Sequence, residues 1–225
     1  MLLDDSLRDT LAAAIRAYDF PCGTYDFAAE REVVHPSMRG VEQAIRSGLT
    51  ADDMEAVRDG LSNVLYWGYA RIDYGDRRVR RFREGVTEGQ LHDARSLFRT
   101  LRGPGLRQIK RLGLPELSGM SFVSKVRMFL DPSNYVTLDM KLAKNLSGGV
   151  SPGLFDDLSF RPGKDTTIRI TAHNEAVYER WCRLCRHLAA TCFPGAGVRA
   201  ADIERGIFHL VSTNACLVAD ILATA

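Results

Sequence analysis

The chain of 225 residues lacks several features, and each absence excludes a class of protein. No apolar run approaches the roughly 18 residues that a membrane-spanning helix needs. The first ten residues, MLLDDSLRDT, carry acidic side chains where a signal peptide has a basic region. Strong net charge is also missing, since the formal charge is +2 and the isoelectric point is about 8.3. These absences predict a cytoplasmic protein without membrane contact. The overall charge alone gives no reason to expect a nucleic-acid partner.

Disulfide and metal-ligand patterns are absent as well. The five cysteines form an odd set without the spacing of a disulfide framework, which favours reduced thiols. The segment W181-C-R-L-C-R-H187, with Cys192 after it, could suggest zinc or an iron–sulfur cluster, but a continuous helix would spread these side chains over different faces. Packing of Cys182, Cys185 and Cys192 as buried thiols is therefore favoured. We predict no metal and no cofactor.

The dominant pattern that is present is the spacing of amphipathic helices. Between residues 87 and 101 the apolar side chains form one stripe, and Thr87 with Gln90 has the form of an N-terminal capping box. The only strand-like run, residues 166–170, is too short to found a sheet. The pattern predicts an all-α fold with loops at 19–39 and 147–172. The predicted helices span residues 4–18, 40–47, 50–70, 87–101, 104–112, 121–130, 139–146, 173–192 and 200–222, the last with a break near 212–214.

Basic side chains are concentrated in two segments although the net charge is small. Six arginines lie between residues 71 and 83 against two aspartates, and residues 94–115 contain six basic side chains and no acidic one. Three arginines of the second segment follow one another at four and three positions, which places them on one helix face. Such clusters are either solvated helix faces or a track that binds phosphates. The residues assigned to this basic track are Arg95, Arg99, Arg102, Arg107 and Lys110.

A lysine and an aspartate stand out in the run from Ser118 to Leu146. On a helical wheel of residues 121–130, Lys125 lies at the margin of the apolar side. Such a lysine either extends its amine to water or becomes partly buried. Burial, together with a place near the positive N-terminal end of a helix, favours the neutral, nucleophilic amine. Asp139 stands where extended residues give way to a helix, so it is predicted to be an N-cap whose carboxylate stays ionised.

The segments L117-S-G-M-S-F-V-S-K-V126 and V136-T-L-D-M-K-L-A143 resemble the core motif of the helix-hairpin-helix DNA glycosylase superfamily, especially its 8-oxoguanine DNA glycosylase-like members. The resemblance implies that Lys125 is the nucleophile and Asp139 its acidic partner. It implies a hairpin and catalytic core at about 87–146 within one glycosylase-like unit, 1–225, whose N-terminal and C-terminal helices form a second lobe, with a cleft between lobes. The residues implied to form the DNA-binding hairpin are Ser118, Gly119, Met120 and Ser121.

The resemblance also implies an activity, that of a base-excision repair glycosylase with associated AP lyase activity. Lys125 would attack the deoxyribose of an extruded nucleotide, with an oxidised purine such as 8-oxoguanine as the expected base, and form a Schiff base. Asp139 would stabilise the positive charge that develops. The expected partner is double-stranded DNA with a damaged base, bound by a monomer associated with the nucleoid. Two other functions stay open: a non-catalytic helix-hairpin-helix DNA-binding module, and an all-α interaction protein without a nucleic-acid role.

Aromatic side chains near these residues are candidates for stacking on the extruded base. Trp67 lies in the aromatic run L65-Y-W-G-Y69, and Phe122 and Phe129 lie on the same helix as Lys125. Their spacing also fits ordinary packing in a helical core. We therefore do not assign the damaged base from these three residues.

Overall fold

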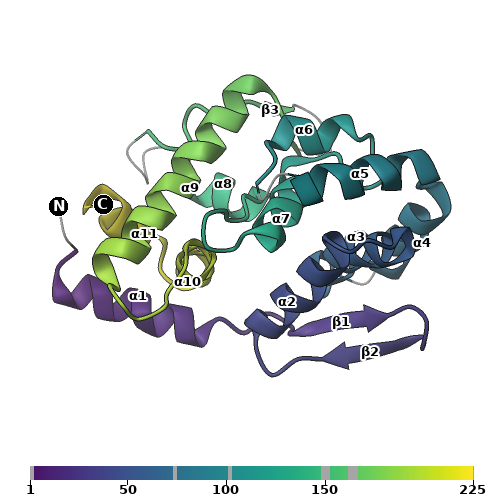
Figure 1. The fold of residues 1–225 in the computed structure, drawn as a ribbon. Helices are drawn as coiled ribbons and strands as arrows, with labels where there is room; N and C mark the ends of the chain where they lie inside the picture. Colours follow the sequence, from purple (N-terminus) through teal and green to yellow (C-terminus); the bar gives the residue numbers. More distant parts are fainter. Residues whose placement is uncertain (1–2, 73–74, 101–102, 148–152, 162–166, 225) are drawn as a thin grey trace. The chain divides into compact units, whose positions relative to one another are not determined.

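A computed structural model describes residues 3–72, 75–100, 103–147, 153–161 and 167–224 (Figure 1). The described residues are mostly helical, which confirms the all-α prediction. Two short antiparallel hairpins pair β1 (Gly23–Asp26) with β2 (Arg31–Val34) and β3 (Phe160–Arg161) with β4 (Thr167–Ile168). The helices are α1 (Asp5–Ala17), α2 (Met38–Leu49), α3 (Met54–Gly68), α4 (Gly75–Gly85), α5 (Glu88–Thr100), α6 (Leu106–Arg111), α7 (Met120–Leu130), α8 (Met140–Leu146), α9 (Ala172–Cys192), α10 (Ala200–Thr213) and α11 (Ala215–Thr224).

The chain divides into two compact units. Residues 20–131 form one of them, which we call the central unit, and it contains Lys125. Residues 1–19 and 132–225 form the other, the terminal unit, and it contains Asp139. Within the described ranges, no helix has both the length and the apolar character that crossing a membrane requires.

Helix α3 is the core of the central unit. Asp53 caps its N-terminus by accepting a hydrogen bond from the backbone N–H of Ala56 at 2.8 Å. The helix then buries Val57, Leu61 and Leu65, which repeat every four residues on one face. It packs against α2, α4, α5, α7 and β1, so it touches most elements of this unit. Since α7 holds Lys125, α3 provides part of the surface on which that side chain rests.

Helix α10 has the same role in the terminal unit. It packs against α1, α8, α9 and α11. Close approach of α1 and α10 requires a glycine at position 206, because a Cβ there would lie 2.7 Å from Cγ1 of Ile15. At the start of the helix, the backbone N–H of Arg199 donates to the carboxylate of Asp202 at 3.0 Å. Its packing against α8 helps to fix the helix that Asp139 caps.

Most predicted helices are confirmed, with their ends shifted by a few residues. The predicted capping box is present, since Thr87 N–H donates to Gln90 at 3.0 Å and Gln90 N–H to Thr87 at 3.2 Å. The predicted break in the last helix falls at Asn214, which ends α10. Helix α3 begins at Met54 and not at residue 50, because Asp53 caps it.

Three features of the described residues were not predicted from the sequence. One is the pairing of β3 with β4, which lies in the segment 147–172 expected to be a loop. The segment 19–39, expected to be a loop, contains the β1–β2 hairpin, whose turn is fixed by Asp26 accepting the backbone N–H groups of Ala28 and Ala29. The arginine-rich segment 75–85 forms helix α4, of which Val79 and Phe82 are the buried side chains. Two apolar residues give too little periodicity to predict a helix, and packing against α3 supplies the missing stabilisation.

Candidate active site

The hairpin between α6 and α7 extends from residue 112 to residue 119. Helix α6 ends at Arg111, Gly113 adopts a positive φ of 64°, and Gly119 is the N-cap of α7. Of the four hairpin residues implied by the resemblance, Ser118 and Gly119 therefore belong to the connection, while Met120 and Ser121 are the first residues of α7. Ser118 is exposed and Met120 is buried, so the exposed part of the hairpin lies before α7.

Side chains from α4 and α5 hold this connection in place. Glu116 adopts a positive φ of 62°, which is strained for a residue with a side chain. Its carboxylate pairs with Arg78 of α4 at 2.5 Å, and Arg81 lies 4.0 Å away. Gln90 of α5 donates to the carbonyl oxygen of Gly113 at 2.7 Å. These contacts place the arginine-rich helix α4 beside the hairpin.

Lys125 lies six residues into α7 and is buried, with 7% of its surface exposed. Its Nζ donates to Oγ of Ser121 at 2.9 Å and lies 3.4 Å from the carbonyl oxygen of the same residue. It also lies 5.1 Å from the centroid of the Phe122 ring. The structure thus buries a side chain that the helical wheel places at the margin of the apolar side, and a serine one turn earlier fixes its amine.

Space for this lysine comes from a glycine on α3. A Cβ at Gly68 would lie 2.5 Å from Cε1 of Phe122 and 3.3 Å from Cδ of Lys125. The first distance is a clash, so a side chain at position 68 would move the Phe122 ring or separate the helices. The absence of that side chain therefore sets the position of the Lys125 methylene groups.

Asp139 is the N-cap of α8, as the sequence predicts. Its Oδ1 accepts the backbone N–H groups of Lys141 at 2.9 Å and Leu142 at 3.0 Å, and the residue is half-buried. Two side chains of α9 fix the extended backbone before it, since Tyr178 donates to the carbonyl oxygen of Val136 at 2.8 Å and Trp181 to that of Thr137 at 3.1 Å. The carboxylate is thus held at a rigid helix start within the terminal unit.

The residues of the basic track have different surroundings. Arg95 donates to the carbonyl oxygen of Asp52 at 2.9 Å, and Arg99 forms an ion pair with the carboxylate of the same residue. Arg107 and Lys110 are exposed on α6, next to the hairpin. Arg102 lies outside the described residues. Helix α4 adds exposed arginines that the track does not include, namely Arg77, Arg80 and Arg81.

The aromatic candidates for a base pocket are mainly core residues. Trp67 and Phe129 are buried and pack edge to face, with ring centroids 5.1 Å apart, and Phe20 covers Trp67 at 4.8 Å. Phe122 is half-buried and contacts the ring of Tyr69 at 4.6 Å. Phe122 is therefore the one of the three whose ring lies next to Lys125.

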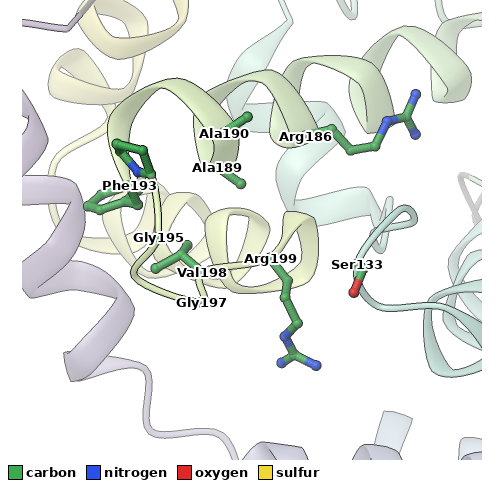
Figure 2. Close-up of a pocket in the computed structure, with 10 residues that line it drawn as sticks. Ser133, Arg186, Ala189, Ala190, Phe193, Gly195, Gly197, Val198 and Arg199 are labelled. Atoms are coloured by element: carbon green, nitrogen blue, oxygen red, sulfur yellow. The ribbon is translucent and has the colours of Figure 1, made fainter.

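The terminal unit has a pocket of about 650 Å³ that sequence reasoning missed. Figure 2 shows Ser133, Arg186 and Arg199 at one end of this pocket and Phe193 at the other. Arg186 donates to the carbonyl oxygen of Asn134 at 2.8 Å. The run F193-P-G-A-G197 forms one wall, and both of its glycines have positive φ. Two glycines around one apolar residue are the local sequence signal for this wall.

The cysteines on α9 are buried thiols, as favoured from the sequence. Cys182, Cys185 and Cys192 are buried and without disulfides, while His187 is exposed. Burial, and then the nearby Cys182 and Glu204, raise the pKa of the Cys185 thiol well above its ordinary value. In the described part of the chain, no three histidine, cysteine or acidic side chains gather as a metal site would require.

A comparison with protein families gives one match. The model of the family described as "Putative 8-oxoguanine DNA glycosylase OGG-like protein" matches residues 33–208, which is most of the chain. The matched range includes the hairpin after α6, Lys125 and Asp139. No curated protein and no solved structure shows a significant match to the chain.

Proposed function

The chain belongs to the family described as "Putative 8-oxoguanine DNA glycosylase OGG-like protein", and we propose that it is a base-excision DNA glycosylase with associated AP lyase activity. Membership relates the chain to DNA glycosylases. The proposed substrate is double-stranded DNA that contains an oxidised purine such as 8-oxoguanine, and the proposed nucleophile is Lys125. We further propose that the protein acts as a monomer in the cytoplasm, associated with the nucleoid.

The observation that supports this proposal most strongly is the environment of Lys125. A surface lysine is almost entirely protonated at neutral pH and cannot act as a nucleophile. Lys125 is buried against Gly68 and Phe122, on the helix that directly follows the hairpin. Ser121 fixes the direction of Nζ, and the burial of the side chain keeps the amine away from bulk water. This is the arrangement that a lysine needs in order to attack an electrophilic carbon.

The proposed reaction starts at C1′ of the damaged nucleotide. A bond forms between Nζ of Lys125 and C1′, while the bond from C1′ to the base breaks and its electron pair leaves with the base, which takes up a proton. Positive charge develops at C1′ during this step, and the carboxylate of Asp139 would stabilise it. Two backbone N–H groups hold that carboxylate in position, so it would not have to reorganise during the reaction.

Strand cleavage would follow from the same covalent intermediate. Loss of an amine proton frees the nitrogen lone pair, which forms the C1′=N bond of a Schiff base while the C1′–O4′ bond breaks, and O4′ takes up a proton as the sugar ring opens. Loss of a proton from C2′ then expels the 3′-phosphate by β-elimination. Water finally hydrolyses the Schiff base and returns the free amine. Asp139 is the proposed acceptor for a proton in these steps.

DNA would bind through the hairpin and the basic helices around it. Arg78 and Arg81 connect α4 to Glu116 of the hairpin, so phosphates beside the hairpin would also meet the exposed arginines of α4. Arg107 and Lys110 lie on the helix before the hairpin. The interface that we propose therefore consists of the hairpin, the α6 part of the basic track and the exposed side of α4.

The experiment that tests this function uses duplexes with one abasic site or one 8-oxoguanine and traps the Schiff base with borohydride. The wild type should form a covalent adduct and Lys125→Met should form none, because methionine fills the same buried space without an amine. Lys144→Ala, which removes an exposed lysine, is the matched control and should trap normally. Binding that depends on salt but never yields an adduct would instead support the non-catalytic DNA-binding module.

A further inference from the structure

The central unit contains an open pocket of about 560 Å³ whose lining combines aromatic and charged side chains. Glu32 comes from β2, Tyr66 and Tyr69 come from the C-terminal end of α3, and Arg71 follows that helix. Asp76 of α4 completes the polar part of the wall. A pocket with ring faces, one guanidinium and carboxylates suits a planar, hydrogen-bonding ligand.

The chain builds this pocket by fastening the β1–β2 hairpin to α3. The side-chain amide of Asn63 donates to the carbonyl oxygen of Tyr25 at 3.0 Å and accepts its backbone N–H at 2.6 Å. Tyr25 is paired with Glu32 across the hairpin, so the two side chains lie on the same face. The Tyr25 ring contacts the Tyr66 ring at 5.6 Å, one turn after Asn63. Glu32 is thereby brought beside Tyr66.

The carboxylate of Glu32 is held in a defined place. A Cβ at Gly23 would lie 2.5 Å from its Oε1, so the glycine leaves the room that this carboxylate occupies. Burial, followed by the charge of Glu32 and the hydrogen bond to it, raises the pKa of Tyr66 to about 12. The hydroxyl therefore keeps its proton at neutral pH and donates it to Glu32. A carboxylate has about four acceptor positions, so Glu32 can accept further donors from a ligand.

The pocket is connected to Lys125 by direct contacts within the same unit. Tyr69 lines the pocket, and its ring lies 4.6 Å from the Phe122 ring. The Phe122 ring in turn lies 5.1 Å from Nζ of Lys125. Gly68, beside Tyr69 in the chain, touches both Phe122 and Lys125. A single aromatic side chain thus separates the pocket wall from the proposed nucleophile.

We propose that this pocket receives the extruded base and recognises a guanine-type edge, in which two adjacent N–H donors stand beside a carbonyl oxygen. Glu32 accepts both N–H donors, Arg71 donates to the carbonyl oxygen and Tyr69 stacks on the ring. Arg71 lies 5.2 Å above the Phe20 ring, which supports its guanidinium at the pocket wall. An adenine-type edge presents a ring acceptor in place of one donor, and the carboxylate would repel it. This proposal rests on the proposed function, because the base must be extruded near Lys125.

The test compares excision of a base with reaction at an abasic site, which has no base to recognise. Glu32→Gln keeps the size of the side chain but turns an NH₂ group toward the donors of the base. We expect it to reduce excision of 8-oxoguanine about tenfold or more. The rate of borohydride trapping at an abasic site should change by less than about threefold, since the substitution does not affect Lys125. Glu88→Gln, which makes the same change at an exposed position in the first turn of α5, outside the proposed interface and the pocket, is the matched control for both assays.

The ratio of two substrates separates recognition from a general loss of structure. Excision of 8-oxoguanine relative to 8-oxoadenine should fall in Glu32→Gln, because the amide no longer distinguishes the two edges. Unchanged excision in this variant would overturn the proposal. An equal loss of excision and of abasic-site trapping would also overturn it, since the variant would then act on Lys125 and not on the base.

If the wild-type protein forms no borohydride-trapped adduct with abasic-site DNA, the proposed lyase function is contradicted. The pocket is then tested by ligand binding alone. Saturation-transfer NMR with free 8-oxoguanine should show contact with the wild type and loss of that contact in Glu32→Gln. Absence of binding to the wild type, or binding that Glu32→Gln leaves unchanged, would overturn the proposal that this pocket recognises the base. The two proposals can therefore fail separately.

Discussion

Arg78 of α4 and Glu116 of the hairpin form an ion pair at 2.5 Å, and Glu116 holds a left-handed backbone conformation with φ of 62°. The pair joins the arginine-rich helix α4 to the connection between α6 and α7. Arg78 is 37% exposed, so water screens much of the attraction. The contact therefore determines where the hairpin lies more than it stabilises the fold.

Two substitutions at position 116 separate the ion pair from the backbone strain. Glu116→Ala and Glu116→Gly both remove the pair with Arg78, but only glycine relieves the positive φ. We expect the glycine variant to be more stable than the alanine variant by about 1 kcal/mol. Urea unfolding followed by circular dichroism measures both. Equal stability of the two variants would show that the strain at this position is not significant.

Gly68→Ala should impair the proposed active site without unfolding the protein. The added Cβ would meet Phe122 at 2.5 Å and Lys125 at 3.3 Å, so the lysine must shift. We expect the rate of trapping at an abasic site to fall about tenfold, because the Phe122 ring beside the lysine must move and the nucleophile loses its productive position. Gly89→Ala is the control, since its Cβ would meet only Thr87, at 3.9 Å. Normal trapping by Gly68→Ala would contradict the assignment of Lys125.

DNA binding should depend steeply on salt. If about five basic side chains neutralise phosphates, the logarithm of the binding constant should fall against that of the salt concentration with a slope of roughly −4 to −5. Arg107→Gln should reduce the magnitude of this slope by about 1. Arg8→Gln, on α1 of the terminal unit, should leave the slope unchanged. Fluorescence anisotropy at several salt concentrations measures these slopes, and a flat dependence would exclude the proposed interface.

Because of Asp202, the free energy of unfolding should depend on pH under acidic conditions. Burial acts to raise the pKa of this carboxyl, but the hydrogen bond and charge of Arg199 and the charge of Arg205 outweigh it and hold the pKa below its ordinary value of 3.8. The ionised group therefore stabilises the fold above about pH 4, and this contribution is lost as the pH falls through the folded-state pKa. The stability difference between wild type and Asp202→Asn should shrink between pH 6 and pH 3. Denaturant unfolding at both values checks this, and a constant difference would contradict the assignment.

The sequence predicted the parts of the fold that depend on local signals. Thr87 and Gln90 form the predicted capping box, Asp139 is the predicted N-cap, and the last helix breaks at Asn214. The family match also confirms the resemblance that the segments around Lys125 and Asp139 indicated. Such features need only a few neighbouring residues, so they are visible without knowledge of the packing.

Features that depend on contacts distant in the sequence were missed. Helix α4 is held by packing against α3, and the β1–β2 hairpin by Asn63, which lies 38 residues after Tyr25. The helical wheel could not show that Gly68 leaves room for Lys125, because the two residues lie on different helices. The pocket that Glu32 lines was missed for the same reason, since Glu32 comes from a hairpin that the sequence did not predict and the other lining residues come from around α3 and α4.

The most direct test of the central claim is to locate the covalent bond on the chain. After borohydride trapping with an abasic-site duplex and digestion of both polymers, mass spectrometry identifies the modified peptide. The candidate lysines are Lys110, Lys125, Lys141, Lys144 and Lys164. The proposal predicts the reduced deoxyribose remnant on Lys125 alone. A remnant on another lysine or on the N-terminal amine, with Lys125 unmodified, would contradict it.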